Sequence, residues 1–359
     1  MRTYLAILFL SAAATYLATP FARRLAIFLK AMDLPSARKI HLEPTPRLGG
    51  VAVFIGFCVP FVGFYIWQNR VSEIFKNYET AVFSLVIGGG MMLALGIYDD
   101  CKGADARKKF IAQILAALWL YFFGGFRIEV LSVPFHGSVH LGWFGLPISI
   151  LWIVMITNAI NLLDGIDGLV SGVTATIALA LGIINVYYGN TIIAVLTFCL
   201  AGACLGFLPH NFAPARIFLG DSGSLFIGIV LGGISMFSLF KSATATLIAA
   251  PLILFGLPLF DTTSVMIGRL AARQPLFKAD KSHIHHRLLE LGLSQKQAAL
   301  YLYSITGLLS ALSIATVIEG ERLQVFAALL LVLAIGWLGW KMRAARLRCS
   351  PSNKPSTIY

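Results

Sequence analysis

Apolar stretches run through this sequence almost from end to end and are separated only by short polar breaks. A helix that crosses the hydrocarbon core of a bilayer needs about 20 predominantly apolar residues. Because 58% of the residues are hydrophobic and only 12% are charged, a water-soluble fold would leave large apolar surfaces exposed. The sequence therefore predicts an all-α, polytopic transmembrane helical bundle.

Eleven stretches are predicted to be spans, although 110–124 is short and 147–163 runs into a glycine-rich polar segment. We expect them to form a single domain, residues 1–342. A basic and then Ser/Pro-rich tail, residues 343–359, is expected to be disordered. The stretches centre near residues 4–22, 49–67, 80–98, 110–124, 147–163, 168–187, 191–208, 223–240, 244–262, 298–318 and 323–341.

The basic residues are divided unequally between the two sides of such a bundle. Most of the 28 Lys and Arg fall in alternate loops and in the tail, which predicts that this side faces the cytoplasm. The N-terminus is then outside and the C-terminus inside. All nine aspartates lie on the same side or at helix ends that face it, which favours a shared site there. On the outer side, residues 127–143 are expected to form a small hairpin.

Two other classes of interpretation fit the sequence poorly. The net charge of +12 comes from short loops and not from a basic patch interleaved with aromatic residues, so nucleic-acid binding is not expected. The five cysteines include no CxxC pair and lie mostly in apolar stretches, which predicts free thiols without a structural disulfide.

Basic residues lie next to glycines in one predicted cytoplasmic segment, Pro44–Gly50, and next to two aspartates in another, which begins at Asp99. In Pro44–Gly50, Arg47 can hold a phosphate through two hydrogen bonds, although it also suits a simple helix entry. Asp99 and Asp100 end the third span, and adjacent helical residues point about 100° apart, so we expect different partners for the two carboxylates. The alternative is an acidic helix end balanced by the basic residues that follow. Among those, Lys108 is a candidate substrate-binding residue.

Two further segments carry polar residues at span ends. In the first, two aspartates three residues apart are each followed by glycine, which lets a ligand approach the backbone. In the second, an aspartate between glycine and serine at a helix start can hold a metal beside phosphate-binding N–H groups. The second segment lacks the spacing of a serine-hydrolase G-x-S-x-G motif. Their candidate residues are Asn158, Asn161, Asp164 and Asp167 in the first segment, and Asn211 and Asp221 in the second.

The loop 263–297 contains an H-x-H-H pattern among Lys and Arg. It lacks the Glu and the i, i+4 histidine pair of a zinc protease, so a catalytic zinc site is not expected. Histidines among cations suit a diphosphate, whereas the alternative is a basic helix on the membrane surface. The candidate residues are His283, His285, His286 and Arg287.

Taken together, carboxylates and cations on one membrane face favour phosphoryl transfer, in which positioning and charge neutralisation provide most of the catalysis. A few carboxylates that share an ion with substrate phosphates suit Mg²⁺ or Mn²⁺.

From Asp33 to Gln297 the chain resembles the polyprenyl-phosphate N-acetylhexosamine-1-phosphate transferases. The resemblance rests on PTPRLGG, the DD pair at a span end, NAINLLDGIDGL, NFAPARIFLGDSGS and the HIHH loop. HIHH followed by RLLELGLS is similar to the WecA/TagO branch, which uses a UDP-N-acetylhexosamine. MraY, the phospho-MurNAc-pentapeptide transferase, has a different histidine-rich loop and is the more distant relative.

The resemblance implies that undecaprenyl phosphate attacks the β-phosphorus of a UDP-sugar, releases UMP and begins a cell-surface glycan at the bacterial inner membrane. It implies catalytic roles for Asp99, Asp100 and Asp221, and metal ligands in Asp221, Asp164 and Asp100. The remaining candidates named above would bind substrate. Direct attack is preferred over a covalent aspartyl-phosphate, because the acceptor is already an anion.

Several alternatives remain open at this stage. A multi-span transporter would place its charged sites near the bilayer midplane, whereas these acids gather at one face. A membrane scaffold would not need five such motifs. The N-acetylhexosamine, the glycan pathway and the division of roles between Asp99 and Asp100 stay undetermined, and related enzymes suggest a homodimer.

Overall fold

The computed structural model describes residues 1–34, 44–66, 69–133, 137–239, 249–271 and 283–319. These residues form an all-α bundle with two small two-stranded sheets, which confirms the predicted fold class. Eight of the described helices are long and apolar enough to cross a membrane. They are α1 (Arg2–Phe28), α2 (Gly49–Ile66), α4 (Glu79–Lys102), α6 (Gly145–Leu163, with the preceding 3₁₀ turn η1, Gly142–Phe144), α7 (Leu169–Tyr187), α8 (Thr191–Asn211), α9 (Gly220–Leu239) and α13 (Gln295–Glu319).

Three of the eleven predicted spans have other outcomes. The stretch at 110–124 forms α5 (Ala106–Phe123). This helix carries three basic residues, Arg107 to Lys109, in its first turn and is not among the eight candidate spans. Where the structure describes it, the stretch at 244–262 is not one continuous helix, because α10 (Ala249–Leu254) ends just before α11 (Gly256–Ala271) begins. Pro258 has no N–H to continue the helical hydrogen bonding across this break. The stretch at 323–341 and the tail from 343 lie outside the described residues.

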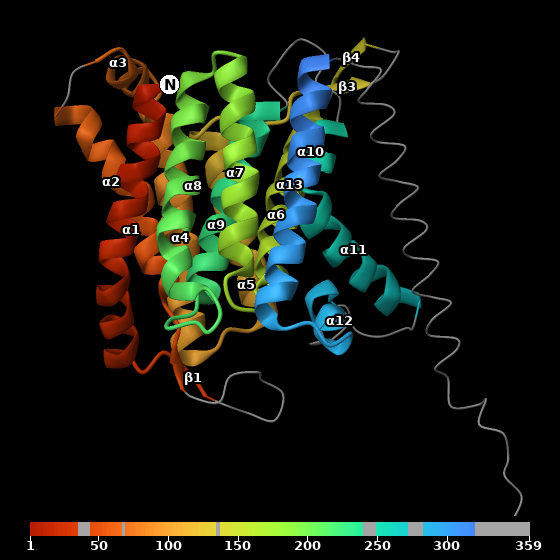
Figure 1. Ribbon diagram of the computed structural model, residues 1–359. Coiled ribbons are helices and arrows are strands. Elements are labelled where there is room, and N and C mark those ends of the chain that lie inside the picture. Colours follow the sequence, from red (N-terminus) through yellow and green to blue (C-terminus); the bar gives the residue numbers. More distant parts are fainter. Residues whose placement is uncertain (35–43, 67–68, 134–136, 240–248, 272–282, 320–359) are drawn as a thin grey trace, which may run out of the picture.

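The two ends of the bundle carry different connections (Figure 1). The N-terminus, α3 (Arg70–Asn77) and the hairpin of β3 (Val130–Val133) with β4 (Gly137–His140) lie at one end. The hairpin expected within 127–143 is therefore confirmed. At the opposite end lie β1 (Met32–Asp33), which pairs with β2 (Thr45–Pro46), and the short helix α12 (Ile284–Glu290). This is the end predicted to face the cytoplasm.

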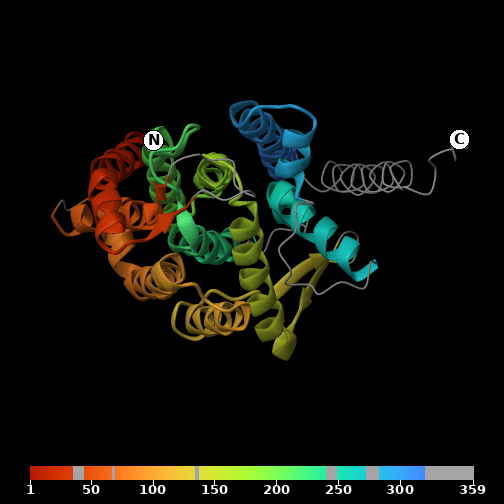
Figure 2. The same cartoon turned by 90° about the horizontal axis from the view of Figure 1, so that it is seen from below.

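Helix α9 is the most enclosed of the candidate spans and packs against α4, α6 and α2. In the view along the bundle, α1 and α2 (red and orange) lie at one side and α11 to α13 (cyan and blue) at the other (Figure 2). Helices α4 and α9 touch through backbone at Gly96, where an added Cβ would lie 2.3 Å from Ser222 Cα. This close approach brings the Asp99-Asp100 pair of α4 beside the start of α9.

Candidate functional site

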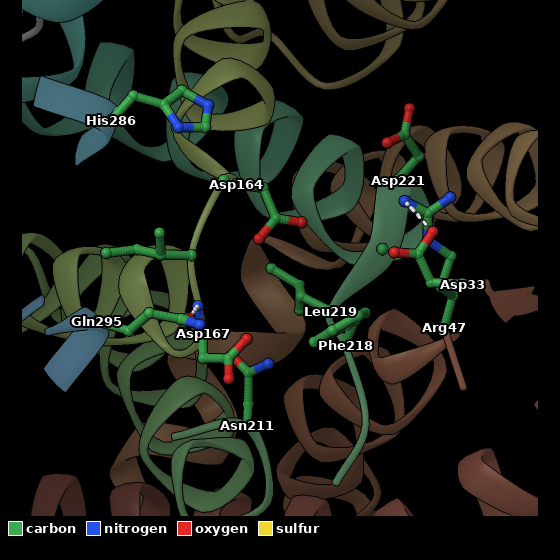
Figure 3. A pocket seen from close by; sticks show the side chains of 13 residues that line it. Asp33, Arg47, Asp164, Asp167, Asn211, Phe218, Leu219, Asp221, His286 and Gln295 are labelled. Carbon is green, nitrogen blue, oxygen red and sulfur yellow. Dashed lines mark hydrogen bonds and ion pairs between the residues drawn. The ribbon is translucent and has the colours of Figure 1, made fainter. Parts of the chain in front are cut away.

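A cavity of about 270 Å³ opens among the loops and helix ends at the α12 end of the bundle (Figure 3). It gathers residues from distant parts of the sequence, including the loop before α2, the turn between α6 and α7, the start of α9 and helix α12. The sequence-predicted candidates that line it are Arg47, Asp164, Asp167, Asn211, Asp221 and His286, joined by the unpredicted Asp33 and Gln295.

Three aspartates form an acidic cluster at this cavity. Asp99, Asp100 and Asp221 each offer a carboxylate oxygen, and these oxygens lie within 4.8 Å of one another. Asp221 belongs to both the cluster and the cavity lining, so the cluster adjoins the cavity at this residue. Like charges at this separation repel strongly unless a cation lies among them.

Asp100 holds the N-terminus of α9. Its two carboxylate oxygens accept hydrogen bonds from the backbone N–H groups of Asp221 and Ser222, each at 3.0 Å. These N–H groups have no partner within their own helix, so a carboxylate from α4 satisfies them. Gly220 has φ +72°, and an added Cβ would lie 2.5 Å from Asp100 Oδ2. Only glycine fits there without displacing the carboxylate.

Asp99 has different partners, as expected from the helical geometry. Its carboxylate accepts hydrogen bonds from Ala104 N–H and from Lys109 Nζ, the latter at 2.7 Å. Lys109 Nζ also pairs with Asp221, so one ammonium group bridges two of the three acids. An ammonium at this point shows that the cluster provides a site for positive charge.

The basic residue that reaches the acids is one position away from the candidate named from the sequence. Lys108 is exposed, and in this structure it is Lys109 that makes the contacts with the cluster. Adjacent residues of α5 differ by about 100° in direction, so only one of them can face the cluster. Gln113, four residues beyond Lys109, is also buried on the inward face of α5.

Asp164 lies across the cavity from Asp221 (Figure 3). Burial and the negative charge of Asp221 raise the pKa of the Asp164 carboxyl to about 8, while Arg47 acts in the opposite direction. The uncharged form of the Asp164 carboxyl is therefore favoured at neutral pH unless a cation lies close to it.

Asp167 and Asn211 form the part of the cavity wall beside the loop that precedes α9. Asp167 accepts a hydrogen bond from Ala215 N–H at 2.9 Å. Asn211, which is buried, donates to the Ile217 carbonyl at 3.0 Å and accepts from Ser171 at 3.1 Å. Both side chains thus fix this loop in addition to lining the cavity.

Two predicted asparagines lie deeper in the bundle, and neither is among the lining residues. Asn158 pairs with Gln113 and donates to the Val154 carbonyl of its own helix. Asn161 donates to Ser224 Oγ at 2.8 Å and also lies within hydrogen-bonding reach of Asp221. Asn158 therefore joins α5 to α6, and Asn161 supports the start of α9 from α6.

Arg47 reaches the cavity from the loop between β2 and α2. Its guanidinium pairs with Asp33 at 3.2 Å. A backbone bridge between Arg47 and Phe218 joins this loop to the segment before α9. The Arg47 side chain lines the cavity and is 38% exposed, so its guanidinium remains open to an anionic ligand.

The histidine residues divide into buried and cavity-facing positions. His286 lines the cavity, whereas His283 and His285 are buried. Burial and the neighbouring His286 lower the pKa of His285 to about 3, so this ring is neutral at physiological pH. Arg287 follows on α12, is partly exposed and is not among the lining residues.

The donor set fits a divalent cation of the Mg²⁺ class. Mg²⁺ binds oxygen ligands and usually takes one or two carboxylates together with substrate phosphates. Asp99 and Asp221 offer such oxygens, and Asp164 lies across the cavity from Asp221. Asp100 is already engaged by two N–H groups, although each of its oxygens keeps a second lone pair.

Four residues with defined contacts in this geometry were not among the sequence candidates: Lys109, Asp33, Gln295 and Asp261, whose carboxylate accepts a hydrogen bond from Ile284 N–H at the start of α12. Gln113, a polar residue within an apolar stretch, could have marked the inward face that it shares with Lys109. The other three have partners far away in the sequence, so spacing gave no indication of them.

Comparisons of the sequence with known proteins identify a family model and several relatives. The sequence model of glycosyl transferase family 4 matches residues 82–240. A probable undecaprenyl-phosphate N-acetylglucosaminyl 1-phosphate transferase of Bacillus subtilis (strain 168) is 37% identical over 88% of this chain and 85% of its own length.

The names of two further relatives differ from this one in the lipid phosphate or in the transferred group. A decaprenyl-phosphate N-acetylglucosaminephosphotransferase of Mycolicibacterium smegmatis is 35% identical over 82% of this chain and 78% of its own length. A phospho-N-acetylmuramoyl-pentapeptide-transferase of Moorella thermoacetica is 34% identical over 68% of this chain and 76% of its own length.

Proposed function

The chain belongs to glycosyl transferase family 4, and we propose that it transfers N-acetylglucosamine 1-phosphate from a UDP-sugar to undecaprenyl phosphate, with release of UMP. The observation that carries this proposal is the acidic cluster, Asp99, Asp100 and Asp221, which opens into a cavity that also contains Arg47 and His286. Phosphoryl transfer requires acids that attract a cation and, facing them, groups that bind phosphate.

The proposed reaction is a displacement at the β-phosphorus of the donor. An oxygen of the lipid phosphate forms the new P–O bond, and the bond between the β-phosphorus and the bridging oxygen breaks, so that UMP leaves with that oxygen. Both reactants are anions, so the protein must bring together negative charges that repel one another. We prefer direct attack because the lipid phosphate is already an anionic nucleophile.

The two sides of the cavity would then have different tasks. Asp221 and Asp99 would hold a divalent cation, with Asp164 opposite and Asp100 supporting the start of α9. Such a cation, when bound, would neutralise phosphate oxygens and the developing charge. Lys109, which pairs with both Asp99 and Asp221, would keep the carboxylates in position and share their charge.

The donor would lie between Arg47 and α12. Arg47 presents a partly exposed guanidinium, and His286 faces the same cavity, so both can contact the diphosphate. Asp33 would orient Arg47 through their ion pair. Asp167, Asn211 and Gln295 would shape the wall for the nucleoside or the sugar, and Asn158 and Asn161 would support it from behind.

We place this site on the cytoplasmic face of a bacterial inner membrane, where the basic loops are expected. The choice of N-acetylglucosamine rests on the names of the relatives from Bacillus and Mycolicibacterium. A muramoyl-pentapeptide donor is the alternative, named for a relative that aligns over less of this chain.

The test is UMP release by the purified full chain with undecaprenyl phosphate, Mg²⁺ and a panel of UDP-sugars that includes UDP-N-acetylglucosamine and UDP-MurNAc-pentapeptide. We expect UMP from UDP-N-acetylglucosamine, dependent on both lipid and metal and lost in Asp221→Asn. UMP from the pentapeptide donor alone would correct the substrate, and no UMP from any donor in folded protein would refute the proposal.

A further inference from the structure

Helix α12 brings His286 to the cavity, yet it has only seven residues and is too short to be stable by itself. His283 occupies the position before its first turn but makes no capping hydrogen bond with its own side chain. Another part of the chain must therefore fix where this helix begins and which way its side chains point.

Asp261, in the middle of α11, makes this connection. One of its carboxylate oxygens lies 2.8 Å from His283 Nδ1, and the other accepts a hydrogen bond from Ile284 N–H at 2.7 Å. Asp261 and His283 are only 3% and 5% exposed, so water does not compete for these contacts. Because a carboxylate only accepts hydrogen bonds, His283 Nδ1 must carry a proton.

The two contacts of Asp261 with His283 and Ile284 form an anchor for α12, and three histidine rings in contact connect this anchor with the cavity. The His283 and His285 rings stack with centroids 5.7 Å apart, and the His285 and His286 centroids are 4.4 Å apart. His285 rests on the backbone of Gly165, where an added Cβ would lie 2.0 Å from His285 Nε2. Gly165 itself separates Asp164 from Ile166 at the cavity wall.

We infer that Asp261 is a positioning residue that fixes the start of α12 and the tautomer of His283, and thereby places His286 for binding of the donor diphosphate. This inference rests on the proposed function for the identity of the ligand, whereas the positioning itself does not. Asp261 serves α12 as Asp100 serves α9, since in both cases an aspartate of another helix accepts two hydrogen bonds at the beginning of the helix that it fixes.

A burial role alone would not require a carboxylate at this place. An apolar side chain would fill the same volume, but it would leave His283 Nδ1 and Ile284 N–H without acceptors in buried surroundings. Removing the partner that orients a metal-ligating histidine typically changes affinity or activity about 10- to 100-fold, and by analogy we expect an effect of this order when His283 loses Asp261.

The kinetic experiment compares Asp261→Ala and Asp261→Asn with Thr263→Ala, a control on the same helix whose hydroxyl bonds only within α11. For Asp261→Ala we expect the KM for UDP-N-acetylglucosamine to rise about 10- to 100-fold, with the KM for undecaprenyl phosphate unchanged. Asp261→Asn should lie between, because its amide oxygen can still accept from Ile284 N–H. Equal changes in both KM values would contradict the inference.

Hydrogen exchange gives a second readout that does not depend on turnover. Asp261→Ala should lose amide protection across 284–290, while Thr263→Ala should keep it. Unchanged protection in Asp261→Ala would overturn the positioning role even if the protein proved to act on another substrate. Conversely, if Asp261→Ala loses this protection while the wild type releases no UMP from any donor, the positioning role stands and the proposed function is refuted instead.

Discussion

Helices α9 and α12 both begin at the cavity, and both have an aspartate from another helix at their first turn. Helix α9 has 20 residues and is buried among α2, α4 and α6, whereas α12 has seven and lies at the end of the bundle. The aspartate of α9, Asp100, belongs to the acidic cluster itself, whereas the aspartate of α12, Asp261, is separate from it.

From this difference we expect a more rigid half of the site at α9 and a more adjustable half at α12. The acids lie at the end of α4 and the start of α9, two helices that pack against each other, and α9 is buried in the core of the protein. The histidine that faces them depends on a short helix with one buried anchor. We therefore expect changes near α9 to abolish the chemistry, and changes near α12 to weaken the binding of the donor.

The largest effect should follow from Asp221→Asn, because it removes one of the two charges that Lys109 bridges. We expect the rate of UMP release to fall on the order of 10³-fold, as when a group that stabilises the transition state is lost. Asp105→Asn, at the exposed start of α5, is the matched control and should stay close to wild type. A loss below tenfold in Asp221→Asn would remove Asp221 from the catalytic centre.

Asp100→Ala should reduce both stability and activity, because it leaves two backbone N–H groups of α9 without their acceptor. The expected loss of stability is about 2 kcal/mol, measured by thermal unfolding in detergent. Asp100→Asn keeps one acceptor and should lose less. If both variants unfold like wild type, Asp100 does not fix the start of α9.

The paired variants Lys109→Ala and Lys108→Ala separate two neighbours on α5. Lys109→Ala leaves Asp99 and Asp221 to repel each other and should lower UMP release about 100-fold. Lys108→Ala changes an exposed side chain and should remain within about twofold of wild type. A larger loss in Lys108→Ala than in Lys109→Ala would instead support Lys108, the residue predicted from the sequence, as the functional one.

The smallest of these effects is expected for Gly165→Ala, which tests the α12 half. The added methyl group meets the His285 ring and should displace α12 slightly. We expect the KM for the UDP-sugar to rise about tenfold with little change in kcat. A fall in kcat with unchanged KM would mean that α12 takes part in the chemical step and that the two halves do not differ as described.

The sequence was sufficient for the all-α membrane fold, because long apolar stretches have few other solutions. It also located Asp99, Asp100 and Asp221, since their motifs stand at helix ends. The break between α10 and α11 was not foreseen, because hydropathy does not register a change of helix direction. The side chain of Lys109, and not that of Lys108, faces the acids, and one residue of helical phase decides between them.

Asp261 shows most clearly what sequence reasoning could not reach. It lies within an apolar stretch and was counted among the aspartates, but its partners His283 and Ile284 are more than twenty residues away. Spacing predicts contacts within a helix, whereas this contact depends on how α11 and α12 approach each other in the folded chain.

The most direct test of the account uses UDP-N-acetylglucosamine labelled at the β-phosphorus. Transfer of a sugar phosphate predicts that the label moves entirely to the lipid product, with unlabelled UMP released in equal amount. If the label stays in a released nucleotide, the protein transfers the sugar without its phosphate, and the assignment of Asp99, Asp100 and Asp221 to phosphoryl transfer is wrong.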